Sequence, residues 1–179
     1  MALKATVFRA QVQISDMDRH YYESHALTIA RHPSETDERM MVRLLAFCLY
    51  ADPRLTFTKG VSADDEPDLW QHSLTGEIER WIELGHPDER RIRQACGRAR
   101  EVIVINYGGR AADLWWEQNG ESLRRQRNLR VWSIATPEVR ALAALAERSM
   151  DLNCTIEGGQ VWIGTDQLTV AVTPTDRLA

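Results

Sequence analysis

The stretch Glu-Val-Ile-Val-Ile-Asn-Tyr at residues 101–107 is the most strongly β-forming run of the chain. Its nearly continuous hydrophobicity is typical of a strand that is buried on both faces of a sheet. Two glycines at 108–109 end the run. Helical spacing precedes it at 89–99 and follows it at 110–124, and a further strand is indicated at 129–134. A buried strand between two helices predicts a sheet with helices packed on it.

The same patterns predict the other helices and strands of the chain. Two β-like runs at the start are expected to form a hairpin, Ser34 is a suitable N-cap for the next helix, and residues 68–74 fit either a strand or a helical turn. Further strands are expected at 3–15, 20–31, 55–59, 77–84, 152–157 and 160–172, a loop at 60–67, and helices at 34–51 and from Thr136-Pro137. The order predicts an α+β (mixed α/β) fold, with a central mixed β-sheet flanked by helices, an extra N-terminal hairpin and C-terminal strands.

The composition describes an ordinary globular chain of 179 residues, 44% hydrophobic and 27% charged, and we expect one domain over residues 1–179. The net charge of -4 argues against a strong non-specific nucleic-acid binder. The three cysteines form no Cys-x-x-Cys pair. No run approaches the length of a membrane span and the start lacks a secretory signal, so we expect no membrane partner and a cytoplasmic location.

Three acidic residues lie where a fold of this class places reactive groups. Glu83 ends an expected strand, next to a glycine turn and a helix start. Asp68 follows Pro67, which fixes the backbone that aims the carboxylate. Glu38 falls on the apolar stripe of the first helix, where Asp37 is its rival. Carboxylates in such a set suit Mg²⁺ or Mn²⁺.

A bound divalent ion would favour hydrolysis of a phosphodiester, because it lowers the pKa of a bound water and neutralises charge on the phosphate. A basic segment with Arg90, Arg91 and Arg93 follows Glu83 and is suited to contact nucleic-acid phosphates. The commoner meaning of such charge runs is solvated surface.

The sequence resembles the YaeQ family over nearly its whole length. The runs that carry the resemblance are Ala30–Met41, Glu66–Trp70, Trp81–Gly85 and Ala95–Ala99, together with Tyr107–Arg110 and Trp115-Trp116-Glu117. The resemblance implies a bacterial protein whose fold is a variant of the PD-(D/E)xK nuclease superfamily. The family is also labelled as connected to transcript elongation. No residue of the sequence supports or excludes that connection.

The resemblance implies roles for four positions. Pro67-Asp68 resembles the "PD" of the superfamily motif, Glu83 its second acid, and Glu38 the acid of the first core helix. The chain departs from the motif at Gly85, where a lysine belongs. That lysine would orient the attacking water and stabilise negative charge.

The missing cation has several candidate replacements. Only two of the 22 basic residues are lysines, Lys4 and Lys59, and a compositional bias of the source explains most of this scarcity. Lys59 precedes Asp68 and is one candidate. Arg90, Arg91 and Arg93 are others, although an arginine cannot lose its proton and so cannot act as a base.

Two hypotheses follow. The first is a metal-dependent nuclease or related phosphodiesterase. The second is a non-catalytic interaction or regulatory protein on a nuclease-like scaffold, with a link to transcription as one variant. Carboxylates of Asp68 and Glu83 that lie close together, with Lys59 or an arginine nearby, would favour the enzyme. Carboxylates that diverge, or that pair with arginines, would favour the second hypothesis.

Overall fold

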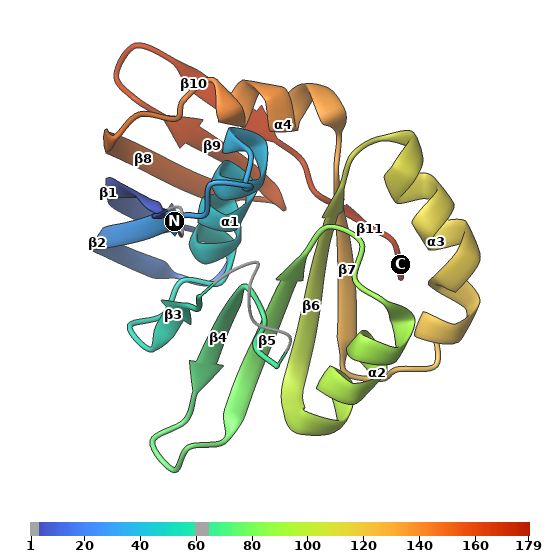
Figure 1. Ribbon diagram of the computed structural model, residues 1–179. Helices are drawn as coiled ribbons and strands as arrows, with labels where there is room; N and C mark the ends of the chain where they lie inside the picture. Colours follow the sequence, from blue (N-terminus) through green and yellow to red (C-terminus); the bar gives the residue numbers. More distant parts are fainter. Residues whose placement is uncertain (1–3, 60–64) are drawn as a thin grey trace. The chain divides into compact units, whose positions relative to one another are not determined.

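The computed structural model describes residues 4–59 and 65–179, which form four helices and eleven strands (Figure 1). The helices are α1 (Asp37–Leu49), α2 (Glu89–Arg98), α3 (Arg110–Leu123) and α4 (Thr136–Ala143). The strands are β1 (Thr6–Asp16), β2 (Tyr21–Arg31), β3 (Leu55–Phe57), β4 (Leu69–His72), β5 (Ile78–Leu84), β6 (Ala99–Tyr107), β7 (Leu129–Ile134), β8 (Ser149–Glu157), β9 (Gln160–Gly164), β10 (Thr169–Val172) and β11 (Thr175–Asp176). Residues 60–64 of the loop expected at 60–67 lie outside the described residues.

The chain divides into two compact units. The first unit contains residues 1–49 and 137–174, and the second contains residues 50–136 and 175–179. Each unit has its own mixed sheet. The expected mixed fold with helices and strands is therefore confirmed, but the described residues build two sheets where the sequence predicted one central sheet.

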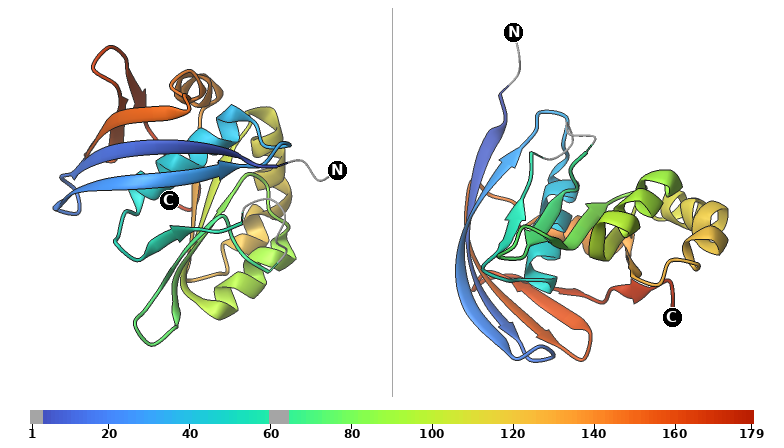
Figure 2. Two further views of the ribbon diagram at one scale, coloured as in Figure 1. Left: turned by 60° about the vertical axis from the view of Figure 1, so that its left-hand side comes forward. Right: turned by 90° about the horizontal axis from the view of Figure 1, so that it is seen from below.

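The sheet of the first unit has the strand order β10-β9-β8-β1-β2. β1 and β2 form the expected antiparallel hairpin, in register from Thr6 opposite Arg31 to Asp16 opposite Tyr21, and β1 runs parallel to β8 (Figure 2). Alternate residues of β1 are buried, as period-two patterning requires. The run expected at 160–172 is two strands, because the chain turns after Gly164, where the Thr165 N–H donates to the Leu168 carbonyl.

Helix α1 packs on the inner face of this sheet. The Phe47 ring meets the His25 ring of β2 edge-on, with centroids 5.0 Å apart. The Cys48 thiol contacts that of Cys154 on β8, and this contact together with burial raises the pKa of the Cys48 thiol. The helix starts at Asp37 and not at the expected cap Ser34. The hydroxyl of Thr36 accepts the Arg39 N–H, at 3.1 Å, and supplies the cap.

The sheet of the second unit has the strand order β11-β7-β6-β5-β4-β3, with β5, β6 and β7 parallel. Strand β6 is central, and its residues 102–105 are fully buried, which confirms the prediction of burial on both faces. Helices α2 and α3 connect these parallel strands and lie on one face of the sheet (Figure 1). Two crossovers of the same hand between neighbouring strands require this arrangement.

One face of this sheet forms a core with the two helices. Trp81 of β5 and Val104 of β6 pack with Ile92 of α2 and Trp115 of α3. Trp70 of β4 joins them, with its ring edge-on to that of Trp81 and the centroids 6.1 Å apart. Residues 69–72, which the sequence left between strand and helical turn, form strand β4 because they pair antiparallel with β5. The core thus fixes the carboxyl end of β5, where the predicted acids lie.

Candidate functional site

Asp68 and Glu83 meet at the carboxyl end of β5 in the second unit. The backbone N–H of Asp68 donates to the Ile82 carbonyl at 3.0 Å. The backbone N–H of Leu84 donates to Oδ2 of Asp68 at 2.9 Å. The Asp68 carboxylate is therefore held beside the peptide group that links Glu83 to Leu84.

Strand alternation places both acidic side chains on one face. Trp70 and Trp81 are cross-strand partners, and Asp68 and Glu83 each lie two residues from one of them along the chain. Both acids are buried, with exposed fractions of 7% for Asp68 and 4% for Glu83. Like charges on facing strand positions repel each other, so this pair needs a compensating cation or a proton.

Arg91 on α2 supplies a cation to this pair. Its Nε donates to Oε1 of Glu83 in a short ion pair. Its Nη2 donates to the carbonyl of Glu66 at 2.6 Å. Asp88 caps the helix that carries Arg91, since its Oδ1 accepts the Arg90 N–H at 2.8 Å. This cap fixes where α2 begins and so the origin of the Arg91 side chain.

The environment of Glu83 favours the protonated form of its carboxyl group. Burial is the largest cause and raises its pKa. The Arg91 guanidinium opposes this and lowers the pKa, whereas the charge of Asp68 raises it. The indole N–H of Trp81 also lowers the pKa of Glu83 from a distance, although it forms no hydrogen bond of ordinary length. The raised pKa of Glu83 is consistent with a neighbouring Asp68 carboxylate.

The other predicted basic residues differ from Arg91. Arg90 and Arg93 are exposed, and Nη1 of Arg93 lies 3.5 Å from Oε1 of Glu89 and not at the Asp68–Glu83 pair. Lys59 is exposed and is the last described residue before the gap at 60–64. Of these four candidates, Arg91 is the one whose contact with a predicted acid is established.

Glu38 belongs to the first unit, whereas Asp68 and Glu83 belong to the second, so its role as a third acid stays a prediction. It is half-buried on α1. The buried acid at this end of the helix is Glu35, which the sequence did not single out. Its carboxylate pairs with Arg39 at 2.8 Å and with Arg43 at 2.7 Å, and this gives it a structural role.

The backbone conformation at position 85 explains why a glycine stands there. Gly85 has a φ of +88°, in the left-handed region that L side chains rarely adopt. Its N–H donates to the Ile105 carbonyl at 2.9 Å. A lysine at this position would strain the turn that ends β5.

The two carboxylates suit one hard divalent ion, because Mg²⁺ is commonly bound through one or two carboxylates and keeps waters for its other positions. Among residues 4–59 and 65–179, no group of three or more His, Cys, Asp or Glu side chains is placed to hold a metal. Oε1 of Glu83 is already paired with Arg91 in this structure.

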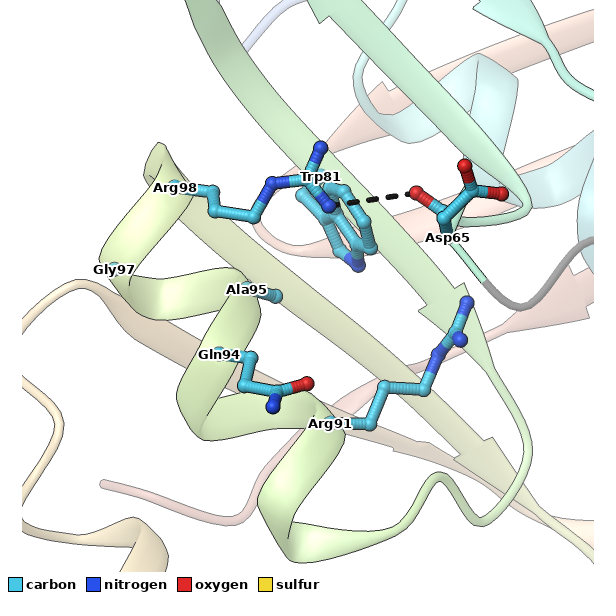
Figure 3. A pocket seen from close by; sticks show the side chains of 7 residues that line it. All are labelled: Asp65, Trp81, Arg91, Gln94, Ala95, Gly97 and Arg98. Carbon is cyan, nitrogen blue, oxygen red and sulfur yellow. Dashed lines mark hydrogen bonds between the residues drawn. The ribbon is translucent and has the colours of Figure 1, made fainter.

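A pocket of about 440 Å³ lies between α2 and β5, and Arg91 is one of the residues that line it (Figure 3). Its lining residues are Asp65, Trp81, Arg91, Gln94, Ala95, Gly97 and Arg98. The sequence did not predict this pocket. The spacing of Arg91, Ala95 and Arg98 on one helix face was the available signal.

Comparison with known proteins gives the family. The sequence model of the YaeQ protein family matches residues 1–174. The chain belongs to the YaeQ family. It is 48% identical over 167 residues to the uncharacterized protein YaeQ of Escherichia coli K12, covering 93% of this chain and 92% of that protein. The relative from Salmonella typhi is 48% identical over 163 residues, covering 91% and 90%.

Solved structures of the YaeQ family match as well. The crystal structure of YaeQ from Xanthomonas axonopodis pv. citri is 53% identical, with a TM-score of 0.95 over 98% of this chain and 99% of that one. YaeQ from Pseudomonas syringae is 31% identical, with a TM-score of 0.93 over 98% and 97%. The names of these YaeQ proteins state no activity. In the described part of the chain, no helix has the length and hydrophobicity needed to cross a membrane.

Proposed function

We propose that the protein is a Mg²⁺- or Mn²⁺-dependent phosphodiester hydrolase of the nuclease type, on a variant of the PD-(D/E)xK scaffold. The observation that carries the proposal is the pair of buried carboxylates, Asp68 and Glu83, at the end of a parallel strand. Buried like charges are costly to a fold, and their retention at a strand end is typical of a functional site. A divalent ion between them would offset the repulsion.

The two acids and Arg91 would have separate roles in this reaction. Asp68 and Glu83 would hold the ion, which when bound lowers the pKa of a water and polarises a phosphate oxygen. Arg91 would bind the phosphate and stabilise the negative charge that develops on it. An arginine cannot act as a base, so Arg91 would orient and neutralise but not accept a proton.

Other predicted residues complete this proposal. Arg90 and Arg93 are exposed on the same helix as Arg91 and would contact neighbouring phosphates of a nucleic acid. Glu38 would serve as a third acid, and Lys59 as a second cation near Asp68. These roles rest on the family resemblance and on residue type.

Cleavage of nucleic acid tests the proposal. Purified protein is incubated with Mn²⁺ or Mg²⁺ and with single- and double-stranded DNA and RNA. We expect metal-dependent cleavage of at least one substrate, and its loss in Asp68→Asn. Asp151→Asn, which removes an exposed acid of β8, is the matched control and should cleave normally. Activity that needs no metal, or that survives in Asp68→Asn, would exclude this mechanism.

The ion pair between Arg91 and Glu83 favours a second candidate, a non-catalytic interaction protein on the same scaffold. An arginine that permanently neutralises Glu83 would leave one carboxylate for an ion. This candidate predicts no cleavage and no Mn²⁺ binding in a calorimetric titration. Mn²⁺ binding in the native protein that disappears in Glu83→Gln would decide for the enzyme.

A further inference from the structure

The pocket between α2 and β5 has features of a ligand site beyond the carboxylate pair. Its volume of about 440 Å³ falls in the range of small-molecule sites. Trp81 and Ala95 line it, and the Arg98 guanidinium lies over the Trp81 ring at 5.0 Å from the centroid. Figure 3 shows Gln94 and Arg91 on the same side as Ala95. The pocket thus combines a flat, apolar wall with several hydrogen-bond donors.

The Trp81 indole N–H is buried and lies toward the Glu83 carboxylate without a hydrogen bond of ordinary length to it. The Trp81 side chain is 2% exposed, and its Nε1 has no hydrogen-bond partner. A buried N–H without an acceptor costs roughly 1–3 kcal/mol, so native proteins keep few of them without a reason. In Figure 3 the ring nitrogen lies at the end of the indole that faces Arg91. A ligand oxygen near Arg91 would satisfy this donor.

The charges in the pocket favour an anion. Arg91 and Arg98 are seven residues apart on α2 and so line one face of the helix, about 10 Å apart along its axis. Arg98 is exposed, and its Nη1 lies 3.4 Å from the backbone carbonyl of Asp65, at the outer limit of a hydrogen bond. Its charge therefore remains available to a ligand. Asp65 is the acid of the pocket, and it is exposed at the rim.

We propose that this pocket binds the phosphate group of a nucleotide, with Arg91, Arg98 and the Trp81 N–H as donors to its oxygens. The two guanidinium groups and the indole N–H offer donors that match a phosphate ester, which offers acceptors only. The inference rests on the proposed function for the identity of the ester as part of a nucleic acid. The binding itself needs no metal.

A phosphate in the pocket would change the partner of Arg91. In the structure Arg91 pairs with Glu83. A phosphate oxygen at Arg91 competes with that carboxylate, and Glu83 then becomes available to a divalent ion. Phosphate and metal should therefore bind with positive coupling, and by linkage each should raise the affinity for the other.

Nuclear magnetic resonance tests the binding directly. The indole N–H signal of Trp81, assigned through the backbone, is followed while AMP, a dinucleotide, inorganic phosphate or adenosine is added without metal. We expect AMP or the dinucleotide to move the signal at lower concentration than inorganic phosphate, and adenosine to leave it unchanged. Equal affinity for inorganic phosphate would overturn the assignment to a nucleotide, and an equal response to adenosine would overturn the phosphate site.

Two arginine variants make the test specific. Arg98→Gln should weaken AMP binding about tenfold, the loss expected for one charged hydrogen bond. Arg125→Gln removes the same charge from an exposed position outside the pocket and should change it less than about twofold. Equal losses in both variants would show a general charge effect and refute the site.

A calorimetric titration with Mn²⁺, with and without AMP, separates this inference from the proposed function. Coupling predicts tighter Mn²⁺ binding when AMP is present. If AMP moves the Trp81 signal and Mn²⁺ does not bind, the hydrolase proposal fails and the phosphate site stands. If Mn²⁺ binds and AMP does not move the signal, the phosphate site fails and the hydrolase proposal stands.

Discussion

Replacing Arg91 by Gln should destabilise the protein in a way that depends on pH. The substitution leaves Glu83 buried beside Asp68 without the cation that now pairs with it. The pKa of Glu83 is already raised, chiefly by burial, and both contributions of Arg91 lower it. Loss of Arg91 therefore raises the pKa of Glu83 further, and the ionised carboxylate becomes more costly in the folded state.

The size of the effect follows from the burial of the pair. Removing one partner of a fully buried ion pair costs about 3–5 kcal/mol. The Glu83 side chain is 5% exposed but that of Arg91 is 29% exposed, so solvent already screens part of the interaction. We expect a loss of about 2 kcal/mol in the free energy of unfolding at pH 7.5. For a chain of this length, the midpoint of thermal unfolding should fall by about 4–8 °C.

The sign of the pH dependence is fixed by linkage. A carboxyl group whose pKa is higher in the folded than in the unfolded state binds more protons when folded. The free energy of unfolding then falls as pH rises from the unfolded to the folded pKa of Glu83. The difference between native protein and Arg91→Gln should be largest at pH 7.5 and should shrink toward about pH 4, where Glu83 is protonated in both states.

Urea unfolding at pH 4, 5.5 and 7.5 measures this difference. Arg93→Gln, which removes an exposed arginine from the same helix, is the control and should lose less than about 0.5 kcal/mol. Adding Glu83→Gln to Arg91→Gln should restore most of the stability, because the unpaired charge is then gone. A loss in Arg91→Gln that is the same at every pH, or that persists in the double variant, would refute the electrostatic reasoning.

Three further predictions concern other residues. Glu35→Gln should cost about 3–5 kcal/mol in urea unfolding, because Arg43, whose side chain is 2% exposed, loses its buried partner. Gly85→Ala should lower the free energy of unfolding by about 1–2 kcal/mol through backbone strain alone, since an added Cβ at this φ of +88° meets no atom within 4 Å. Trp132→Phe removes the bond from Nε1 to the Tyr50 hydroxyl, at 2.7 Å, and should raise the already raised pKa of Tyr50 further, as measured by ultraviolet titration, because this bond lowers it.

Much of the fold could be predicted because local patterns and tertiary packing agree. The strand at 129–134 has the predicted bounds, and the β1–β2 hairpin follows from strict alternation. The division into two sheets could not be predicted, because it depends on which strands pair over long distances. Ser34 was a sound cap by residue type, but its hydroxyl interacts with the His32 ring at 2.7 Å, and Thr36 caps the helix instead.

The candidate site could be predicted in part for similar reasons. Asp68 and Glu83 were visible because a Pro-Asp step and a strand end are local features. The sequence offered Arg90, Arg91 and Arg93 as cations. The orientation of the helix decides that Arg91 contacts Glu83. Arg91 lies four residues before Ala95, which is buried, and so borders the packed side of α2. The sequence contains this spacing, but it does not show that this side of α2 lies against Glu83.

An arginine can replace a lysine at position 85 as a positive charge. It cannot replace that lysine as a proton acceptor. The guanidinium of Arg91 donates to the Glu83 carboxylate and to the Glu66 carbonyl at once, which suits its planar fork of donors. It cannot lose a proton, so a hydrolytic mechanism here would have to place the proton elsewhere. In the proposed hydrolase Asp68 and Glu83 would hold the ion, so neither carboxylate is free to act as the base. An Arg91→Lys protein keeps the positive charge but not the planar fork of donors, so any metal-dependent activity should fall in it.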